Sequence, residues 1–203
     1  MALTQVDRTL IRLSTAIVLG EWDEVRRLRR EECEQGPNRA WRECVLQTHL
    51  FAGFPRLVQA FSVLEEVGGL GEVQANELEG SLKSEEERGS ELFSRIYADQ
   101  ADGLREKLGS YHEDFGNWIL EHAYARVLAR PGLPADRREL LAACALAALD
   151  QDRQLASHAR GSLRCGATFE ELTAAFDCVQ DLIGSERCTR AKRIAERFRA
   201  TQN

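Results

Sequence analysis

Apolar residues recur with the period of an amphipathic α-helix in nearly every part of this chain where a period is visible. Near the start they fall at positions 6, 10, 13 and 17, after Thr4 as an N-cap and before Gly20 as a stop. The same reasoning predicts helices over residues 22–34, 38–52, 152–165, 168–183 and 186–200, and others that begin at residues 55, 84 and 134 or end before 131. No run of alternating Val, Ile and Thr between turn residues indicates a strand. The sequence therefore predicts an all-α protein.

One predicted helix differs from the others because its middle is apolar on every side. Leu140–Leu149 is an uninterrupted apolar run of ten residues, which predicts a buried helix. This length is about half of what a helix needs to span a bilayer, so we expect no membrane partner. Asp7 and Arg8 stand where a secretory signal would need an apolar run. We therefore expect a cytoplasmic protein.

Composition and charge narrow the class of protein. The chain has 203 residues, of which 43% are hydrophobic and 30% charged, as in globular domains. Its formal net charge of −6 argues against a general nucleic-acid-binding protein, because phosphate binding needs a basic surface. Its six cysteines form no CxxC or CxxH pair, so we expect reduced thiols and no bound metal.

The second half of the chain repeats the first. When the sequence is shifted by 130 residues, Arg8–Ile11 aligns with Arg138–Leu141, and with one more residue Gly53 aligns with Gly184. Each copy is too short to bury much core alone, so we expect the copies to pack on each other or on other subunits. We predict three parts: a degenerate first helical copy (1–67), a connector with middle helices (68–133) and a second copy that carries the site (134–203).

His158 is the histidine most suited to a functional role. Its predicted helix face also carries Leu155, Ala159 and Ser162. A histidine on such a face is either a core residue with satisfied hydrogen bonds or a group that faces a site. The spacing alone leaves both interpretations open.

Short segments of the second copy carry a resemblance to a known family. They are Arg130–Leu133, Arg138–Leu141, Gln154–Leu155 with His158, and Gly166–Thr168 with Glu170–Glu171. In these segments the chain resembles the carboxymuconolactone decarboxylase family, within the alkylhydroperoxidase-D-like superfamily. The resemblance implies an internally duplicated, alkylhydroperoxidase-D-like helical bundle of bacterial origin. It also implies a homo-oligomer, either a trimer or a hexamer.

The resemblance further implies that Glu139 on one helix meets His158 on the next. We expect the two side chains to lie within hydrogen-bond reach, about 2.6–3.2 Å, beside a cavity open to solvent. The first copy has Thr9 and Leu28 at the corresponding positions. Neither side chain transfers a proton usefully, so we expect one site per chain.

The positions just ahead of the histidine distinguish two branches of the superfamily. The peroxidase branch carries a CxxC there, whereas this chain has Gln151 and Gln154. A thiol peroxidase needs a thiolate nucleophile and a resolving thiol. The decarboxylase branch needs neither, so that branch is the better match.

The resemblance implies a cofactor-independent decarboxylase or related lyase that acts on a small carboxylated lactone or keto acid. His158 would be the general acid, because an imidazole with its ordinary pKa of about 6.5 suits proton donation near neutrality. Glu139 would orient it. Arg138 and Arg160 would anchor the substrate carboxylate, which a guanidinium matches in a bidentate way. The alternatives are a non-catalytic binding or assembly protein that retains the fold, and a peroxidase that uses Cys165.

Overall fold

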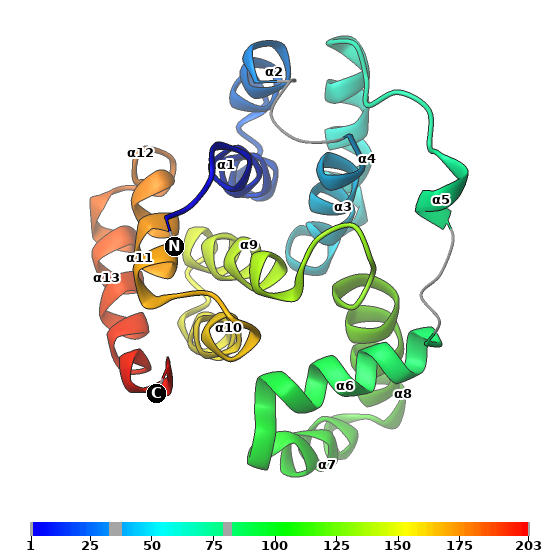
Figure 1. The fold of residues 1–203 in the computed structure, drawn as a ribbon, viewed down its shortest axis with the longest axis vertical. Helices are drawn as coiled ribbons and strands as arrows, with labels where there is room; N and C mark the ends of the chain where they lie inside the picture. The colour runs from blue at the N-terminus through cyan, green and yellow to red at the C-terminus, as the bar shows by residue number, and fades with distance from the viewer. Residues whose placement is uncertain (1, 33–37, 79–82, 203) are drawn as a thin grey trace.

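The computed structural model describes residues 2–32, 38–78 and 83–202, and every regular element in these ranges is a helix (Figure 1). The prediction of an all-α protein is confirmed. The predicted end of the second helix and Cys33 lie outside the described residues. None of the helices within these ranges is both long and apolar enough to cross a membrane.

The first helical unit comprises α1 (Gln5–Leu19), α2 (Trp22–Glu31), α3 (Asn38–Gln47) and α4 (His49–Glu66). The predicted cap is present: Thr4 accepts a hydrogen bond from the Asp7 backbone N–H, and α1 ends at Gly20 with φ +80°. The predicted stop at Gly53 is instead a kink within α4, where this glycine takes φ +77° and ψ 168°. The break between helices falls earlier, at Thr48.

The second helical unit follows the same plan. It comprises α9 (Ala135–Ala148), α10 (Asp152–Cys165), α11 (Phe169–Cys178), α12 (Gln180–Ile183) and α13 (Ser185–Glu196), and the short η3 (Arg199–Gln202) ends the described chain. Its first helices begin 130 or 131 residues after their counterparts in the first unit. Gly184, with φ +85° and ψ 154°, separates α12 from α13 in the conformation that kinks α4. Asp150 has φ +57° where the first unit has Gly20.

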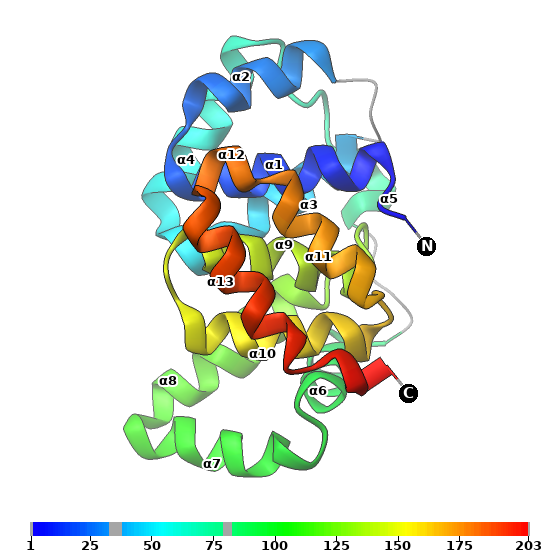
Figure 2. The ribbon, with the colours of Figure 1, turned by 90° about the vertical axis from the view of Figure 1, so that its left-hand side faces the viewer.

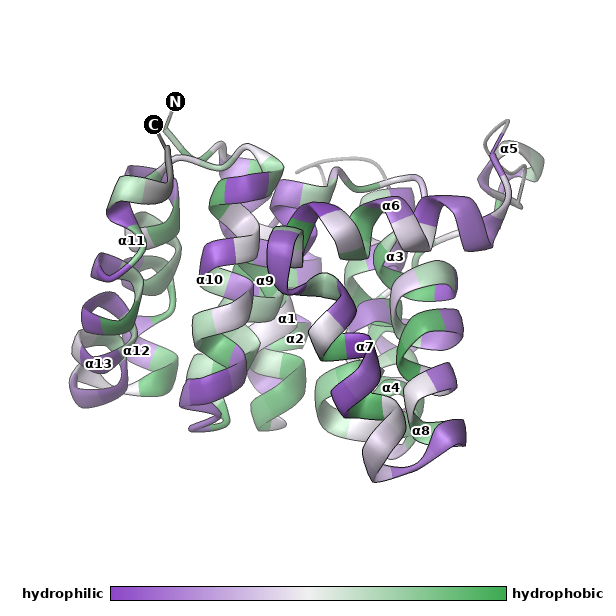
Figure 3. Ribbon diagram, turned by 90° about the horizontal axis from the view of Figure 1, so that it is seen from below, coloured by the Kyte–Doolittle hydropathy of each residue, from purple (hydrophilic) through white to green (hydrophobic). Residues whose placement is uncertain are grey.

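Helix α9 forms the centre of the molecule, between α1 and α10 (Figure 1). Every residue from Arg138 to Ala148 is buried, so the prediction of a buried helix is confirmed. A side chain on any face of this segment meets another helix, which explains why the segment has no polar face. Figure 3 shows the usual pattern on the outer helices, where hydrophilic and hydrophobic stretches alternate.

The middle section lies against α10 and extends beyond it (Figure 2). It comprises α5 (Ala75–Leu78), α6 (Glu85–Tyr97), η1 (Ala98–Gln100), α7 (Ala101–Tyr111), α8 (Glu113–Asn117) and the π-helix η2 (Trp118–Leu128). In the last part of this section we expected an α-helix that ends before residue 131. In η2 the hydrogen bonds instead span five residues, as from Ala129 N–H to Tyr124 C=O at 2.9 Å. Trp118, the first residue of η2, is 65% exposed.

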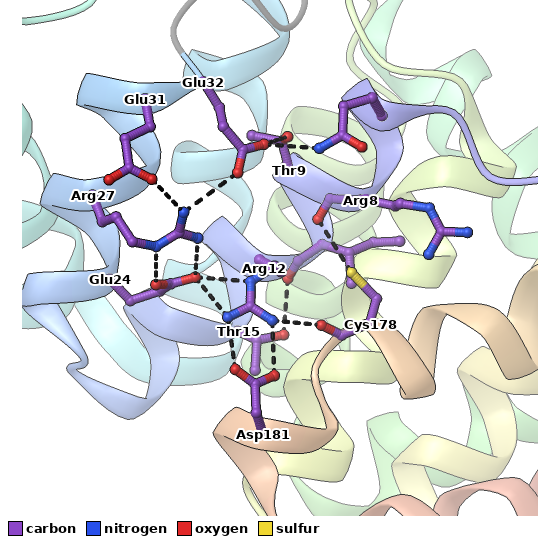
Figure 4. A network of polar contacts seen from close by, with 12 residues as sticks. Arg8, Thr9, Arg12, Thr15, Glu24, Arg27, Glu31, Glu32, Cys178 and Asp181 are labelled. Carbon is purple, nitrogen blue, oxygen red and sulfur yellow. Dashed lines mark hydrogen bonds and ion pairs between the residues drawn. The ribbon is translucent and has the colours of Figure 1, made fainter.

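Ion pairs connect the two helical units on the side away from the middle section. Arg12 of α1 donates to Asp181 of α12 at 2.8 Å, to the Cys178 carbonyl at 2.7 Å and to Glu24 of α2 at 2.8 Å (Figure 4). One guanidinium therefore links α1 to α2, α11 and α12, and it matches the carboxylate of Asp181 with two parallel hydrogen bonds.

Candidate active site

Glu139 and His158 lie side by side at the contact of α9 and α10. The tight turn at Asp150 folds α10 back along α9, which brings residues 19 positions apart into contact. His158 Nδ1 lies 2.9 Å from Glu139 Oε2, within the expected range. The Glu139 side chain is 1% exposed and that of His158 is 13% exposed. The carboxylate is therefore interior, while the imidazole reaches a surface.

A glycine makes room for the buried carboxylate. Gly161 follows His158 by about one turn of α10, and a Cβ added to it would lie 2.4 Å from Glu139 Oε2. The second carboxylate oxygen, Oε1, is buried and accepts no hydrogen bond from the described residues. Glu139 is thus held by one strong contact, to His158, in a space that only a glycine leaves open.

His158 forms part of the wall of a cavity of about 450 Å³. The cavity lies between both helical units and the middle section, and its wall is mostly apolar. Its large apolar side chains include Phe51 of α4, Phe93 of α6, Leu104 and Leu108 of α7, Ile119 of η2 and Leu146 of α9. Phe51 also meets the His158 ring edge to face, with centroids 6.0 Å apart. A small organic molecule with a flat or apolar body fits such a wall.

The polar groups of the cavity wall come mainly from α7 and α10. Lys107 and Arg153 bring positive charge to it, and Gln154 and Ser157 lie beside His158 on α10. Neither cation forms an ion pair within the described part of the chain. Sequence reasoning missed both, because Lys107 and Arg153 stand on surface-like helical positions and only the fold brings α7 and α10 to the wall of one cavity.

The structure does not place Arg138 at this cavity, so the expected substrate anchor needs correction. Its side chain is 1% exposed. The guanidinium donates to Glu43 Oε2 of α3 at 2.7 Å and to the carbonyls of Arg130 and Pro131. The terminal nitrogens of Arg138 thus hold α9 to α3 and to the chain that precedes it, while its Nε is buried and has no hydrogen-bond partner among the described residues. Arg138 is a structural residue.

Arg160, the other expected anchor, also lies away from the cavity wall. Its guanidinium lies over the ring of Phe198, 5.9 Å from the centroid. Burial lowers the pKa of Arg160, and the neighbouring Arg164 charge adds to this effect. It points toward the C-terminal segment, because the helical period turns residue 160 away from the face that carries residue 158.

The cysteines do not offer a reactive thiol near His158. Burial, followed by the negative charge of Glu139, raises the pKa of Cys165 to about 12. Burial also raises the pKa of Cys144 well above its usual range. A thiol in this state is a weak nucleophile near neutral pH. Within the ranges that the structure describes, no group of three or more His, Cys, Asp or Glu residues is arranged to hold a metal ion.

Together, the fold and the site define a class of protein: a helical protein with a buried carboxylate–imidazole pair at a cavity between helices. Residues 113–197 match the Carboxymuconolactone decarboxylase family. Over 67 residues the chain is 37% identical to the 4-carboxymuconolactone decarboxylase of Acinetobacter baylyi (strain ATCC 33305 / BD413 / ADP1), a region that makes up 33% of this chain and 50% of that protein. The chain thus spans about half the length of this relative. Over residues 113–197 the chain is thus similar to the carboxymuconolactone decarboxylase family.

Proposed function

We propose that the protein is a cofactor-independent decarboxylase for a small carboxylated lactone or keto acid. The observation that carries this proposal is the arrangement of His158. Its Nδ1 faces buried Glu139 at 2.9 Å, which leaves Nε2 as the nitrogen available to a molecule in the cavity. A proton donor oriented by a carboxylate at the wall of a mostly apolar cavity suits general acid catalysis.

The reaction needs no electron acceptor other than the substrate itself. When the carboxylate leaves as CO₂, the electron pair of the broken C–C bond moves to the conjugated carbonyl oxygen and gives an enolate or dienolate. Protonated His158 then delivers its Nε2 proton to carbon, and the electron pair returns from oxygen to form the new C–H bond. Glu139 stabilises the imidazolium and keeps Nε2 directed at the cavity.

Lys107 and Arg153 are the residues we propose for anchoring the substrate, in place of Arg138 and Arg160. Both lie on the cavity wall, and neither is paired with a carboxylate of the described residues. An unpaired cation at the edge of an apolar cavity attracts an anionic substrate and gives up little hydration. The carboxylate that leaves as CO₂ should lie in the apolar part of the cavity, away from these cations, because the loss of its charge is favoured there.

The test is a decarboxylation assay on 4-carboxymuconolactone, the compound that gives the bacterial relative its name. We expect turnover by the wild type and a loss of about 100-fold or more in His158→Ala, because the proton donor is deleted. Glu139→Gln should lose less, since the donor remains. His112→Ala, which removes an exposed histidine outside the cavity wall, is the matched control and should keep its rate.

The same assay separates this proposal from the alternatives. If His158→Ala turns over the substrate at the wild-type rate, His158 is not the acid and the proposal fails. If the wild type binds carboxylated compounds in the cavity without converting any, the chain is a binding or assembly protein that retains the fold. Peroxide consumption that disappears in Cys165→Ser would instead support the peroxidase, against the high pKa of this thiol.

A further inference from the structure

Two tyrosines, Tyr97 and Tyr124, line the same cavity as His158. Tyr97 ends α6, and Tyr124 lies in η2. Both rings pack against Phe93, with centroids 4.6 and 4.8 Å apart. Neither tyrosine belongs to the surface: Tyr124 is 4% exposed, and Tyr97 is half-buried. Their hydroxyls are therefore polar groups in a largely apolar setting.

The hydrogen bonding of this pair leaves one donor unused. Tyr124 Oη donates to Tyr97 Oη at 2.9 Å. The O–H of Tyr97 finds no acceptor among the described residues, although Tyr97 is part of the cavity wall. Leaving a buried donor without a partner costs free energy. A ligand oxygen in the cavity is the acceptor that the arrangement lacks.

The surroundings keep both hydroxyls protonated. Burial raises the pKa of Tyr97, and the Glu139 carboxylate adds to the rise against the opposing effect of the Tyr124 hydrogen bond. Burial raises the pKa of Tyr124 still further, and the neighbouring Tyr97 and Glu139 act in the same direction. Tyr97 is thus a neutral hydrogen-bond donor near neutral pH, and not a base.

The end of α6 holds Tyr97 in this position. The next residue, Ala98, has φ +49° and ψ −124°, a positive-φ conformation that residues with a Cβ seldom adopt. Its N–H still closes the last turn by donating to Ser94 C=O. Strained backbone of this kind often occurs beside functional sites, where the surrounding structure maintains it. Here it turns the chain into η1 while the Tyr97 ring stays against Phe93.

We propose that Tyr97, oriented by Tyr124, donates a hydrogen bond to the substrate oxygen that becomes negatively charged when CO₂ leaves. This inference rests on the proposed decarboxylation and adds a second catalytic residue to it. As the C–C electron pair moves to the carbonyl oxygen, the Tyr97 O–H stabilises the enolate and keeps its proton. His158 then protonates the carbon. The two residues act on different atoms of one substrate, which must therefore carry a carbonyl oxygen conjugated or β to its carboxylate.

The experiment uses 4-nitrophenolate as a probe of the oxyanion position. A hydrogen bond to the phenolate oxygen stabilises its charge and moves the absorption band to shorter wavelength. We expect the full-length protein to bind the dye with such a shift. Tyr97→Phe should lose the shift and bind about tenfold more weakly, because a hydrogen bond to a charged group is lost. Tyr124→Phe should weaken binding by about threefold, since the donor remains but is less well oriented.

The control is His112→Ala, which removes an exposed side chain outside the cavity wall; its effect should stay below about twofold. Circular dichroism shows whether each variant keeps its helices. The proposal is overturned if the wild type does not bind the dye, if it binds without a shift, or if Tyr97→Phe behaves as the wild type does. Loss of turnover in Tyr97→Phe with unchanged dye binding would also overturn it.

Failure of the decarboxylase proposal gives a different result. If no carboxylated substrate is converted, or if His158→Ala keeps full turnover, the reaction assignment falls. The dye shift and its loss in Tyr97→Phe would still stand as evidence for the oxyanion position. If turnover depends on His158 but the dye does not respond to Tyr97, the reaction stands and the role of Tyr97 falls.

Discussion

Glu139 and His158 in the second helical unit occupy the places that Thr9 and Leu28 occupy in the first. The two units have matching helices, and matching glycine conformations at Gly53 and Gly184, so the backbone alone does not make a site. In the first unit Thr9 donates to Glu32 (Figure 4), and Leu28 is fully buried. In the second, the same two positions hold a carboxylate and an imidazole beside a cavity.

A third pair of corresponding positions shows why placing Glu and His at positions 9 and 28 would not be enough to make a site in the first unit. Gly161 leaves the space that Glu139 fills, whereas the first unit has Glu31 at the corresponding position, paired with Arg27 at 2.8 Å. The two units also differ in their contact with the middle section. Its helix α6 packs against α10 of the second unit, and the middle section supplies part of the wall of the cavity that His158 lines. The carboxylate–imidazole pair has the small residue Gly161 behind it and a cavity in front of it, and the corresponding position of the first unit has Glu31 in place of that glycine.

The largest effect is expected from placing the pair in the first unit. In Thr9→Glu/Leu28→His a new carboxylate would lie against Glu32, with an imidazole in the apolar core. We expect a loss of about 4 kcal/mol in the free energy of unfolding, because like charges and an unsatisfied buried group oppose folding. Urea denaturation measures it, with Thr9→Val as the control at about 1 kcal/mol. The double substitution should also fail to restore turnover to His158→Ala, and restored turnover would show that the backbone suffices.

A smaller effect is expected at the joint between the units, where Glu43 of α3 binds Arg138 of α9. Burial would raise the pKa of Glu43, but hydrogen bonds from Arg130 and Arg138 outweigh it and hold the pKa below its ordinary value. The stabilisation is therefore complete above the ordinary pKa of about 4.5 and is lost as the pH falls through the lower, folded-state value. We expect Glu43→Gln to lose about 3 kcal/mol at pH 7, since a buried guanidinium loses its counter-ion.

The pH dependence of unfolding provides the control for this joint. The difference in stability between the wild type and Glu43→Gln should shrink as the pH falls below about 4.5. Thermal unfolding at pH 7 and at pH 3 measures it. An unchanged difference at both pH values would mean that Glu43 does not contribute through its charge.

A third prediction concerns the space behind the Glu139–His158 pair, where we expect a substitution to lower the free energy of unfolding by about 2 kcal/mol. In Gly161→Ala the new Cβ would lie 2.4 Å from Glu139 Oε2, so the carboxylate must move away from His158. We expect lower stability together with a loss of turnover of at least tenfold. Glu31→Ala is the matched substitution in the first unit and should leave turnover unchanged. Wild-type turnover in Gly161→Ala would show that the 2.9 Å contact is not needed.

The smallest effect on stability is expected from a substitution on an outer helix, α4. We expect this substitution to change the assembly of the protein instead. In the first unit α4 exposes Phe54, Val58 and Phe61, where α13 of the second unit has Ser185, Thr189 and Lys192. We predict that this apolar stripe takes part in a homo-oligomer, a trimer or hexamer. Light scattering should show Val58→Glu dissociating it, with unfolding changed by about 0.5 kcal/mol.

Thr189→Glu on α13 is the control for this prediction and should leave the assembly intact. A wild-type mass of 22.8 kDa at micromolar concentration would contradict the oligomer. If the protein forms an oligomer that Val58→Glu does not dissociate, the subunits meet at another surface and the prediction for this stripe is wrong.

The sequence by itself determined the helical class, the two-unit plan and the spacing of Glu139 and His158. These features are local or periodic, because the apolar period and the caps at Thr4 and Thr168 each act within a single helix. A 19-residue separation across a single turn also leaves two neighbouring helices few ways to pack, so the contact of Glu139 with His158 follows from order along the chain.

Only the tertiary structure decided what surrounds that pair. Arg138 and Arg160 lie close to the pair in sequence. However, Arg138 binds Glu43, and Arg160 lies over the ring of Phe198. Lys107 and Tyr97 come from a section whose π-helix and positive-φ residue Ala98 have no periodic signal in the sequence. The wall of the cavity depends on contacts between segments far apart in the chain. Such contacts are set by the packing of whole helices, which a local pattern of apolar and polar residues does not encode.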